Sequence, residues 1–421
     1  MINNFPNDTD QNMHLLHTLK QEQKRRQAYN WLAHARPSQL MPSQPWNIWI
    51  ILAGRGFGKT RTGAESIRQL VEQGYRRICL LGHSELDVVN VMLKGKSGLL
   101  NVDPTAPVLC SSSRQLKWSN GATALITSGC AYEQLRGPEF DCAWIDELAK
   151  FPDPQAAFEQ LQLALRLNTP CGKQPKMIIT TTPKSTPFLK KLLAQEGVYV
   201  TYGSTYDNKA NLSSNFLQTV KQAFEGTRFG AQELHGKMVD FDQFAFCQQQ
   251  HIKYEQINES ECKKIVIALD PAASNTRDET GIIVCALDSN DRFVILEDAS
   301  GLMSPNQWAR KAVDLYRHFN ANAIVAEVNQ GGDMVETLIR QVDTHVRYHK
   351  VHATSSKKTR SQPIAALYEQ GKVVHARSFP ILEEQMLYEH NHSPDRLDAL
   401  VWGITHLLNA VNDNKIFFLN I

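Results

Sequence analysis

The chain has 421 residues, and its 45 Lys and Arg against 43 Asp and Glu give a formal charge of only +2. A chain of this length is too long for one ordinary hydrophobic core, which predicts two domains. With 42% hydrophobic and 21% charged residues, the composition excludes a disordered or fibrous protein. The net charge neither demands nor excludes a nucleic-acid partner, so any DNA contact must come from a local patch.

Two features bear on the compartment of the protein. The eight cysteines are scattered singly, with no C-x-x-C pair and no zinc-ligand spacing, so we expect reduced thiols. The first residues are polar and lack the apolar core of a signal peptide, and no apolar run approaches about 18 residues. We therefore expect a cytosolic protein that is not secreted and does not span a membrane.

The first elements in chain order are a polar lead-in and an α/β domain. Residues 1–45 are predicted to be helical until Pro37, Pro42 and Pro45 stop the helix. Over 46–240, short apolar runs alternate with segments of helical period, which predicts a mostly parallel sheet with flanking helices. The predicted strands are 48–53, 77–81, 122–127, 142–146, 176–180 and 199–203. The polar residues 207–240 are expected to form a helical lid on this domain.

A glycine-rich segment follows the first predicted strand and precedes a helix-compatible stretch. It consists of Gly54, Arg55, Gly56, Phe57, Gly58, Lys59 and Thr60, with Ala53 where the first glycine of a Walker A motif is usual. Its glycines let backbone N–H groups surround an anion, while Lys59 reaches the outer phosphates of ATP and Thr60 ligates Mg²⁺. A plain glycine-rich turn and a dinucleotide-binding turn are the alternatives, and the Lys-Thr ending disfavours both.

An acidic pair ends the predicted strand 142–146. Asp146 is expected to hold Mg²⁺ and Glu147 to activate the attacking water. An apolar run before Asp-Glu is a weak signal alone, but about 90 residues after a phosphate-binding loop it becomes strong. The later strand 176–180 also ends in polar residues, which suits a sensor of the γ-phosphate.

A second domain is predicted at 263–421, after an aperiodic linker at 241–262. Three strands are expected in quick succession, then a helix and a further strand. The predicted elements are strands 264–270, 281–287, 292–297 and 323–328, a helix at 305–319, a strand near 348–353 and a helix from 395 to about 411. This order is typical of an RNase H-like fold.

Four carboxylates lie at the ends of these elements. Asp270 and Glu327 end two predicted strands, and Asp395 and Asp398 lie three residues apart near a helix start. Phosphodiester hydrolysis by two metals needs three or four carboxylates from separate elements. We therefore interpret these residues as catalytic ligands of two Mg²⁺ or Mn²⁺ ions in a nuclease. Each acid alone could be structural, and only their joint placement favours the nuclease.

The residues Lys350 to Arg360 form a basic stretch that carries hydroxyl groups, which suits contacts to DNA phosphates. A solvated loop fits the same pattern, and the sequence leaves both open. His390 and His392 precede the last two acids, but they lack matching cysteines or a helical His pair. We expect surface residues there and not zinc ligands.

Together these residues resemble the large terminase family, especially its gene-transfer-agent-like branch, over 35–408. The matching stretches are 35–39, 54–64, 135–141, 144–150, 204–208, 232–234, 270–271, 278–281 and 393–402. The resemblance implies a packaging ATPase followed by an RNase H-like nuclease on one chain. It also implies that Gln39 contacts the adenine and that Arg55 or Arg136 stabilises charge on the γ-phosphate. For Arg136, that contact could be made to the ATP of a neighbouring subunit.

What the resemblance implies is a motor that drives double-stranded DNA into a procapsid through the portal and cuts concatemeric DNA. The implied partners are DNA, the portal protein, a small terminase subunit and further copies of this chain in a ring, in the host cytoplasm at the procapsid portal. One alternative is a DNA-stimulated helicase or remodelling ATPase with an inactive nuclease-like domain, which the full set of acids disfavours. The other is a non-enzymatic prophage remnant that binds the portal, which the intact ATP motifs disfavour.

Overall fold

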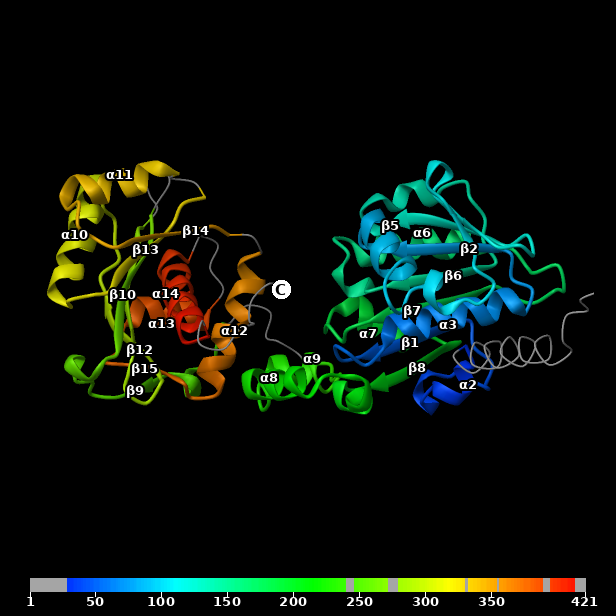
Figure 1. The fold of residues 1–421 in the computed structure, drawn as a ribbon, viewed down its shortest axis with the longest axis horizontal. Helices are drawn as coiled ribbons and strands as arrows, with labels where there is room; N and C mark the ends of the chain where they lie inside the picture. Colours follow the sequence, from blue (N-terminus) through cyan, green and yellow to red (C-terminus); the bar gives the residue numbers. More distant parts are fainter. Residues whose placement is uncertain are drawn as a thin grey trace, which may run out of the picture. The chain divides into compact units, whose positions relative to one another are not determined.

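The computed structural model describes residues 29–239, 246–271, 279–329, 332–353, 356–388 and 394–412. Predictions for 1–28, for 241–245, and for Asp278, His390, His392 and Ser393 lie outside the described residues. The chain divides into two compact units, which we describe separately (Figure 1). The first unit comprises Met1–Leu217 and Ala231–Val239, and the second comprises Gln218–Gly230 and Asp240–Ile421.

An eight-stranded sheet forms the centre of the first unit, in the order β3-β4-β5-β2-β6-β7-β1-β8. Its strands are β1 (Ile48–Ala53), β2 (Arg77–Gly82), β3 (Val108–Cys110), β4 (Gln115–Lys117), β5 (Thr123–Ser128), β6 (Cys142–Asp146), β7 (Lys176–Thr181) and β8 (Val198–Gly203). The six longer strands are parallel, whereas β3 and β4 pair antiparallel at one edge. All six predicted strands are confirmed. Central strands such as β1 and β6 are buried on both faces, which leaves uninterrupted apolar runs in the sequence.

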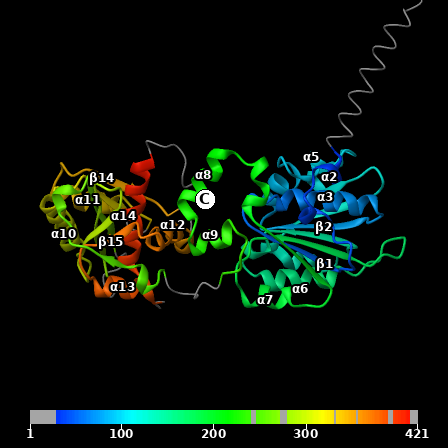
Figure 2. The ribbon, with the colours of Figure 1, turned by 90° about the horizontal axis from the view of Figure 1, so that it is seen from below.

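Helices cover both faces of this sheet (Figure 2). On one face, α3 (Lys59–Glu72) packs with Trp49 and Ile51 of β1. On the other, α6 (Pro154–Ala164) and α7 (Pro187–Leu193) pack with Ile50 and Leu52. This alternation arises because successive side chains of a strand point to opposite faces. Two shorter helices of this unit are α4 (Glu85–Asp87) and α5 (Leu99–Val102). Helices α8 (Ser214–Phe224) and α9 (Arg228–Glu233) each contribute residues to both units.

The proline-bearing lead-in differs from its prediction in one respect. Helix α2 (Trp31–His34) ends before Pro37, as expected. Pro37 also begins a short 3₁₀ helix, η1 (Pro37–Gln39), which the sequence did not predict. Proline fits the first position of a helix, where its missing N–H group has no helical partner to lose.

A seven-stranded mixed sheet forms the centre of the second unit, in the order β14-β13-β10-β11-β12-β15-β9. Its strands are β9 (Lys253–Tyr254), β10 (Lys264–Asp270), β11 (Gly281–Leu287), β12 (Phe293–Asp298), β13 (Ala323–Glu327), β14 (Tyr348–Val351) and β15 (Val373–His375). Strands β10 to β12 form an antiparallel meander, and β13 returns parallel beside β10. The predicted meander and parallel strand are confirmed, and the short β9 lies within the segment that was predicted to be a linker.

Two sets of helices enclose this second sheet (Figure 1). One face is covered by α10 (Pro305–His318) and α11 (Asp333–Val342), and the other by α12 (Lys357–Glu369), α13 (Pro380–Leu387) and α14 (Asp395–Asn412). Helix α14 lies directly on β10 and β11. Gly403 permits this approach, because a Cβ atom there would lie 2.5 Å from Cys285 Sγ. Within the described residues, no helix has both the length and the apolar character that crossing a bilayer requires.

Candidate nucleotide and metal sites

The glycine-rich loop between β1 and α3 has a backbone that only glycine adopts easily. Gly56 and Gly58 have φ angles of +76° and +101°, in the left-handed region. A Cβ atom on Gly58 would also lie 2.9 Å from Gln39 Nε2. The Gln39 side chain is buried at this point and donates a hydrogen bond to Thr62 Oγ1 of α3 at 3.0 Å. The structure thus places Gln39 beside the loop.

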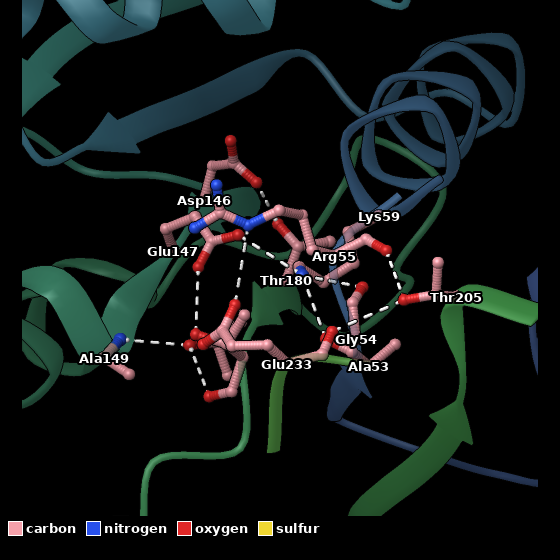
Figure 3. A network of polar contacts seen from close by, with 12 residues as sticks. Ala53, Gly54, Arg55, Lys59, Asp146, Glu147, Ala149, Thr180, Thr205 and Glu233 are labelled. Carbon is pink, nitrogen blue, oxygen red and sulfur yellow. Dashed lines mark hydrogen bonds and ion pairs between the residues drawn. The ribbon is translucent and has the colours of Figure 1, made fainter. Parts of the chain in front are cut away.

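Lys59 joins the loop to the acidic pair. Its ammonium group donates hydrogen bonds to the carbonyl oxygens of Ala53 at 2.9 Å and Gly54 at 3.2 Å. It also lies 3.4 Å from Glu147 Oε1, and these contacts are drawn in Figure 3. The Lys59 side chain is only 7% exposed. A buried ammonium group needs such oxygen partners, and Lys59 thereby links the loop and Glu147 in one network.

Asp146 ends β6 beside the neighbouring strand β7. Thr180 Oγ1 donates a hydrogen bond to Asp146 Oδ1 at 2.5 Å, and Trp144 Nε1 donates one to Thr180 Oγ1 at 2.9 Å. Burial and the adjacent Glu147 raise the pKa of Asp146 to about 7. A cation close to this carboxylate would favour its ionised form. The sequence did not predict the contact to Thr180, because it joins strands far apart in the chain.

Glu147 directly follows β6 and has a strained, left-handed backbone conformation. Its φ angle is +55°, and its N–H group donates to the Thr180 carbonyl oxygen at 2.6 Å. Burial alone would raise the pKa of Glu147, but Lys59 and Lys150 lower it below the ordinary value. The carboxylate is therefore ionised at neutral pH, as a group that polarises water must be.

Side chains outside the motif orient the peptide groups of the loop. Thr205 Oγ1 donates to the carbonyl oxygen of Arg55 at 2.6 Å, and Asn208 Nδ2 donates to that of Gly56 at 2.7 Å. The Arg36 guanidinium donates to the next carbonyl along the loop. Because the C=O and N–H of a trans peptide point in opposite directions, fixing these carbonyls turns the N–H groups the other way. Thr205 and Asn208 lie in a matching stretch to which the sequence assigned no role.

The remaining predicted residues of this site are placed as follows. Arg55 is half-exposed, and its Nε lies 3.6 Å from Glu233 Oε2. The Phe57 ring is buried against β8, so Phe57 offers the site its backbone only. Thr60 lies in the first turn of α3, on the loop side. Arg136 is exposed, and its side chain forms no hydrogen bond or ion pair with the residues that the structure describes.

In the second unit, the structure brings three predicted carboxylates together. Asp270 ends β10, and Asp395 and Asp398 lie in the first turn of α14. One carboxylate oxygen of each lies within 4.8 Å of the others. An all-oxygen donor set from two separate elements suits hard cations such as Mg²⁺ and Mn²⁺. The residues present therefore fit the metal ions that the sequence predicts.

Close packing places the start of α14 over the strand ends. A Cβ atom on Gly281, which pairs with Asp270, would lie 2.0 Å from the Asp395 carbonyl oxygen. Arg396 then fixes the helix, because its guanidinium binds Glu279 at 2.9 Å and Asp298 at 2.7 Å. A glycine and a buried ion-pair network thus position the acids of α14, and neither is evident from the spacing of the acids alone.

Glu327 lies next to this cluster and is not one of its three members. Leu269 of β10 pairs with Ala326 of β13, so the residues that follow them, Asp270 and Glu327, end adjacent strands. Trp402 Nε1 of α14 donates to Glu327 Oε2 at 2.7 Å. Burial, and then the charges of the nearby acids including Glu327, raise the pKa of Asp270 to about 8. The cluster therefore has an excess of negative charge for which a divalent cation could compensate.

Two family models match the chain. The model described as "Terminase large subunit, T4likevirus-type, N-terminal" matches residues 50–253. The model described as "Terminase RNaseH-like domain" matches residues 267–407. Together they cover most of the chain, and each contains one of the two sites.

Solved structures of a large terminase from a thermophilic bacteriophage share this architecture. One crystal form aligns with a TM-score of 0.56 and 13% identity, over 91% of this chain and 97% of that chain. A complex of the same phage protein with ADP aligns with a TM-score of 0.54 and 14% identity, over 90% and 98%. At such identity the likeness shows the fold alone, and no curated protein matches the sequence. The predicted fold class is confirmed, and the chain belongs to the large terminase family.

Proposed function

We propose that this chain is a motor that hydrolyses ATP to move double-stranded DNA through a portal into a procapsid, and that it cuts concatemeric DNA. One observation supports this most. A single chain of this family carries a phosphate-binding loop beside an acidic pair and, separately, three carboxylates whose oxygens lie within 4.8 Å. We propose the division into lead-in 1–45, ATPase 46–240 with its lid 207–240, linker 241–262 and nuclease 263–421.

In the ATPase step that we propose, the loop N–H groups and Lys59 bind the phosphates of ATP. Lys59 pairs with Glu147 in this structure, at 3.4 Å. When the γ-phosphate attracts Lys59, Glu147 is free to direct a water molecule onto that phosphate. Thr60 and Asp146 would hold Mg²⁺, which neutralises phosphate charge when bound. Lys59 thus couples phosphate binding to the position of Glu147.

Three further residues have proposed roles around the nucleotide. The buried Gln39 beside the loop would contact the adenine. Arg55, which lies within the loop itself, would stabilise charge on the γ-phosphate. The exposed Arg136 suits a contact with ATP on a neighbouring copy in a ring. Structures of the thermophilic phage terminase with ADP and with ATP-γ-S support nucleotide use by this fold.

In the cutting step that we propose, Asp270, Asp395, Asp398 and Glu327 hold two Mg²⁺ or Mn²⁺ ions. Such ions activate water and stabilise charge on the scissile phosphate when they are bound. The residues of the chain fix the geometry: Gly281 lets α14 approach the strands, and Trp402 orients Glu327. Because a motor must pass any sequence, DNA would be held by its phosphates, and binding should weaken steeply with salt.

The proposed partners are double-stranded DNA, the portal protein, a small terminase subunit and other copies of this chain. The proposed setting is the host cytoplasm, at the portal of the procapsid. Both the partners and the setting rest on the family, and the fold of this chain is compatible with them.

The test is ATP hydrolysis by the full chain, measured with and without duplex DNA. Lys59→Ala should abolish hydrolysis, whereas Lys191→Ala, on the exposed face of α7, should not alter it. Hydrolysis that persists in Lys59→Ala would overturn the motor assignment. A forked duplex that separates in an ATP-dependent way would favour the helicase alternative, and a wild-type chain without hydrolysis would favour the non-enzymatic remnant.

A further inference from the structure

Two basic side chains of helix α12 form ion pairs with acids of the proposed metal site. The ammonium group of Lys357 pairs with Asp398 Oδ2. Arg360, one turn further along the same helix, places its Nη2 at 3.6 Å from Asp398 Oδ1 and 4.0 Å from Glu327 Oε2. The Arg360 guanidinium also lies over the Trp402 ring, 4.9 Å from its centroid. The acid cluster thus has resident positive charges from its own chain.

These cations belong to the basic stretch Lys350 to Arg360, whose sequence fits either contacts to DNA phosphates or a solvated loop. The structure shows a third arrangement for its described members. Lys350 pairs with Asp333 and Glu336 at the surface of α11. Lys357 and Arg360 point instead at the acids that are proposed to hold the metal ions. Their positive charge is therefore directed at Asp398 and Glu327 in this structure.

Lys357 and a divalent cation need the same carboxylate. An ammonium group in contact with Asp398 and a metal ion on the same residue would lie close together and repel each other. The two occupants differ in mobility, because Lys357 is 43% exposed on a flexible stem, whereas Asp398 is 6% exposed and fixed in α14. When a metal ion binds, Lys357 is the group that can move.

We propose that Lys357 is a built-in competitor of the nuclease metal ions, which occupies Asp398 until DNA draws its ammonium group away. The proposal rests on the nuclease site proposed above and adds a condition for its use. A DNA phosphate offers Lys357 an alternative anion, so DNA binding frees Asp398 and strengthens metal binding. By thermodynamic reciprocity, the metal ions strengthen DNA binding equally. Lys357 thereby makes cutting depend on DNA seated at the cluster.

The test is Mn²⁺ binding to the full chain, measured by titration calorimetry without nucleotide, with and without a short duplex. Lys357→Gln should bind Mn²⁺ about fivefold or more tightly than the wild type, because the competing charge is gone. Lys357→Arg, which keeps the charge, should stay close to the wild type. Lys263→Gln serves as the matched control, because Lys263 is an equally exposed lysine that pairs with Asp291 at 2.7 Å. The duplex should tighten Mn²⁺ binding more in the wild type than in Lys357→Gln.

Two results would overturn the proposal, and they are distinguishable. If Lys357→Gln binds Mn²⁺ no more tightly than the wild type, at a site that Asp270→Ala removes, the competition is absent although the metal site stands. If no chain shows a Mn²⁺ site that depends on Asp270, the proposed nuclease site fails as well. Because Lys357 is exposed, its substitution should leave folding intact, and thermal unfolding of each variant checks this.

Discussion

The carboxylates that are proposed to bind metal ions lie close together, and this crowding should lower the stability of the second unit when they are ionised and no metal is bound. Asp270→Asn tests this directly. Burial and the neighbouring acids raise the pKa of Asp270 to about 8, from an ordinary value of 3.8. The unfolded chain therefore releases this proton near pH 4, whereas the folded chain without metal keeps it until about pH 8. The contribution of Asp270 to the free energy of unfolding is therefore highest below about pH 4, and it is lost progressively as the pH rises from about 4 through 8. Asparagine keeps the shape of the side chain and removes this dependence.

The magnitude follows from the same shift. One pKa unit corresponds to about 1.4 kcal/mol, so the loss between about pH 5.5 and about pH 8.5 is at most about 3 kcal/mol. Because Asp270 is partly exposed to water, we expect about 2 kcal/mol. For a unit of this size, that equals a fall in melting temperature of about 5 °C in the wild type, and almost none in Asp270→Asn.

The assay is calorimetry of the full chain in EDTA at both pH values. The transition of the second unit is the one that a non-hydrolysable ATP analogue leaves unshifted. Mn²⁺ should raise this transition in the wild type and not in Asp270→Asn. Asp314→Asn, on the exposed face of α10, is the matched control and should follow the wild type. If Asp270→Asn shows the same pH dependence as the wild type, the assignment of this dependence to a buried, crowded Asp270 is wrong.

Three further predictions concern packing, pH and the nucleotide loop. Gly403→Ala places a methyl group 2.5 Å from Cys285 Sγ and should destabilise the second unit by about 1–3 kcal/mol, measured by urea unfolding; unchanged stability would contradict the packing of α14. Burial lowers the pKa of His406 to about 4, so the free energy of unfolding should fall as the pH falls from about 6.5 to 4. His406→Gln should abolish this fall, measured by urea unfolding at several pH values in that range. Asn208→Ala removes the bond to Gly56 and should weaken binding of a fluorescent ATP analogue about fivefold, by about 1 kcal/mol, with unchanged melting temperature; equal affinity would mean that Asn208 does not orient the loop.

Much of the fold was predictable because its main strands are buried on both faces. Strands such as β1 and β10 then appear as apolar runs whose ends mark the sites. The strands of two or three residues escaped prediction, since segments as short as β15 carry no pattern of their own. Pro37 shows the limit of single-residue rules, because the helix before it ends as expected while a 3₁₀ helix, which was not expected, begins at the same proline.

Site residues were predictable where they lie at the end of a patterned strand or at the start of a patterned helix. Contacts between side chains of different elements were not predictable. The acids Asp270 and Asp398 mark the ends of patterned segments, which identified them as candidates. The contact of Lys357 with Asp398 joins residues far apart in the sequence, and a basic stretch does not specify its partner. Likewise, nothing in the sequence around Asn208 indicates that its amide holds a loop carbonyl. Such contacts depend on how the elements pack.

The proposal that clustered carboxylates gather metal ions to cut DNA is tested most directly by conversion of supercoiled plasmid in the presence of Mn²⁺. The wild type, Lys59→Ala and the surface control Asp314→Ala should all cut, because none of these changes touches the cluster. Asp270→Ala should leave the plasmid supercoiled at every Mn²⁺ concentration at which the wild type cuts it. Cutting by Asp270→Ala at the wild-type rate would contradict the account.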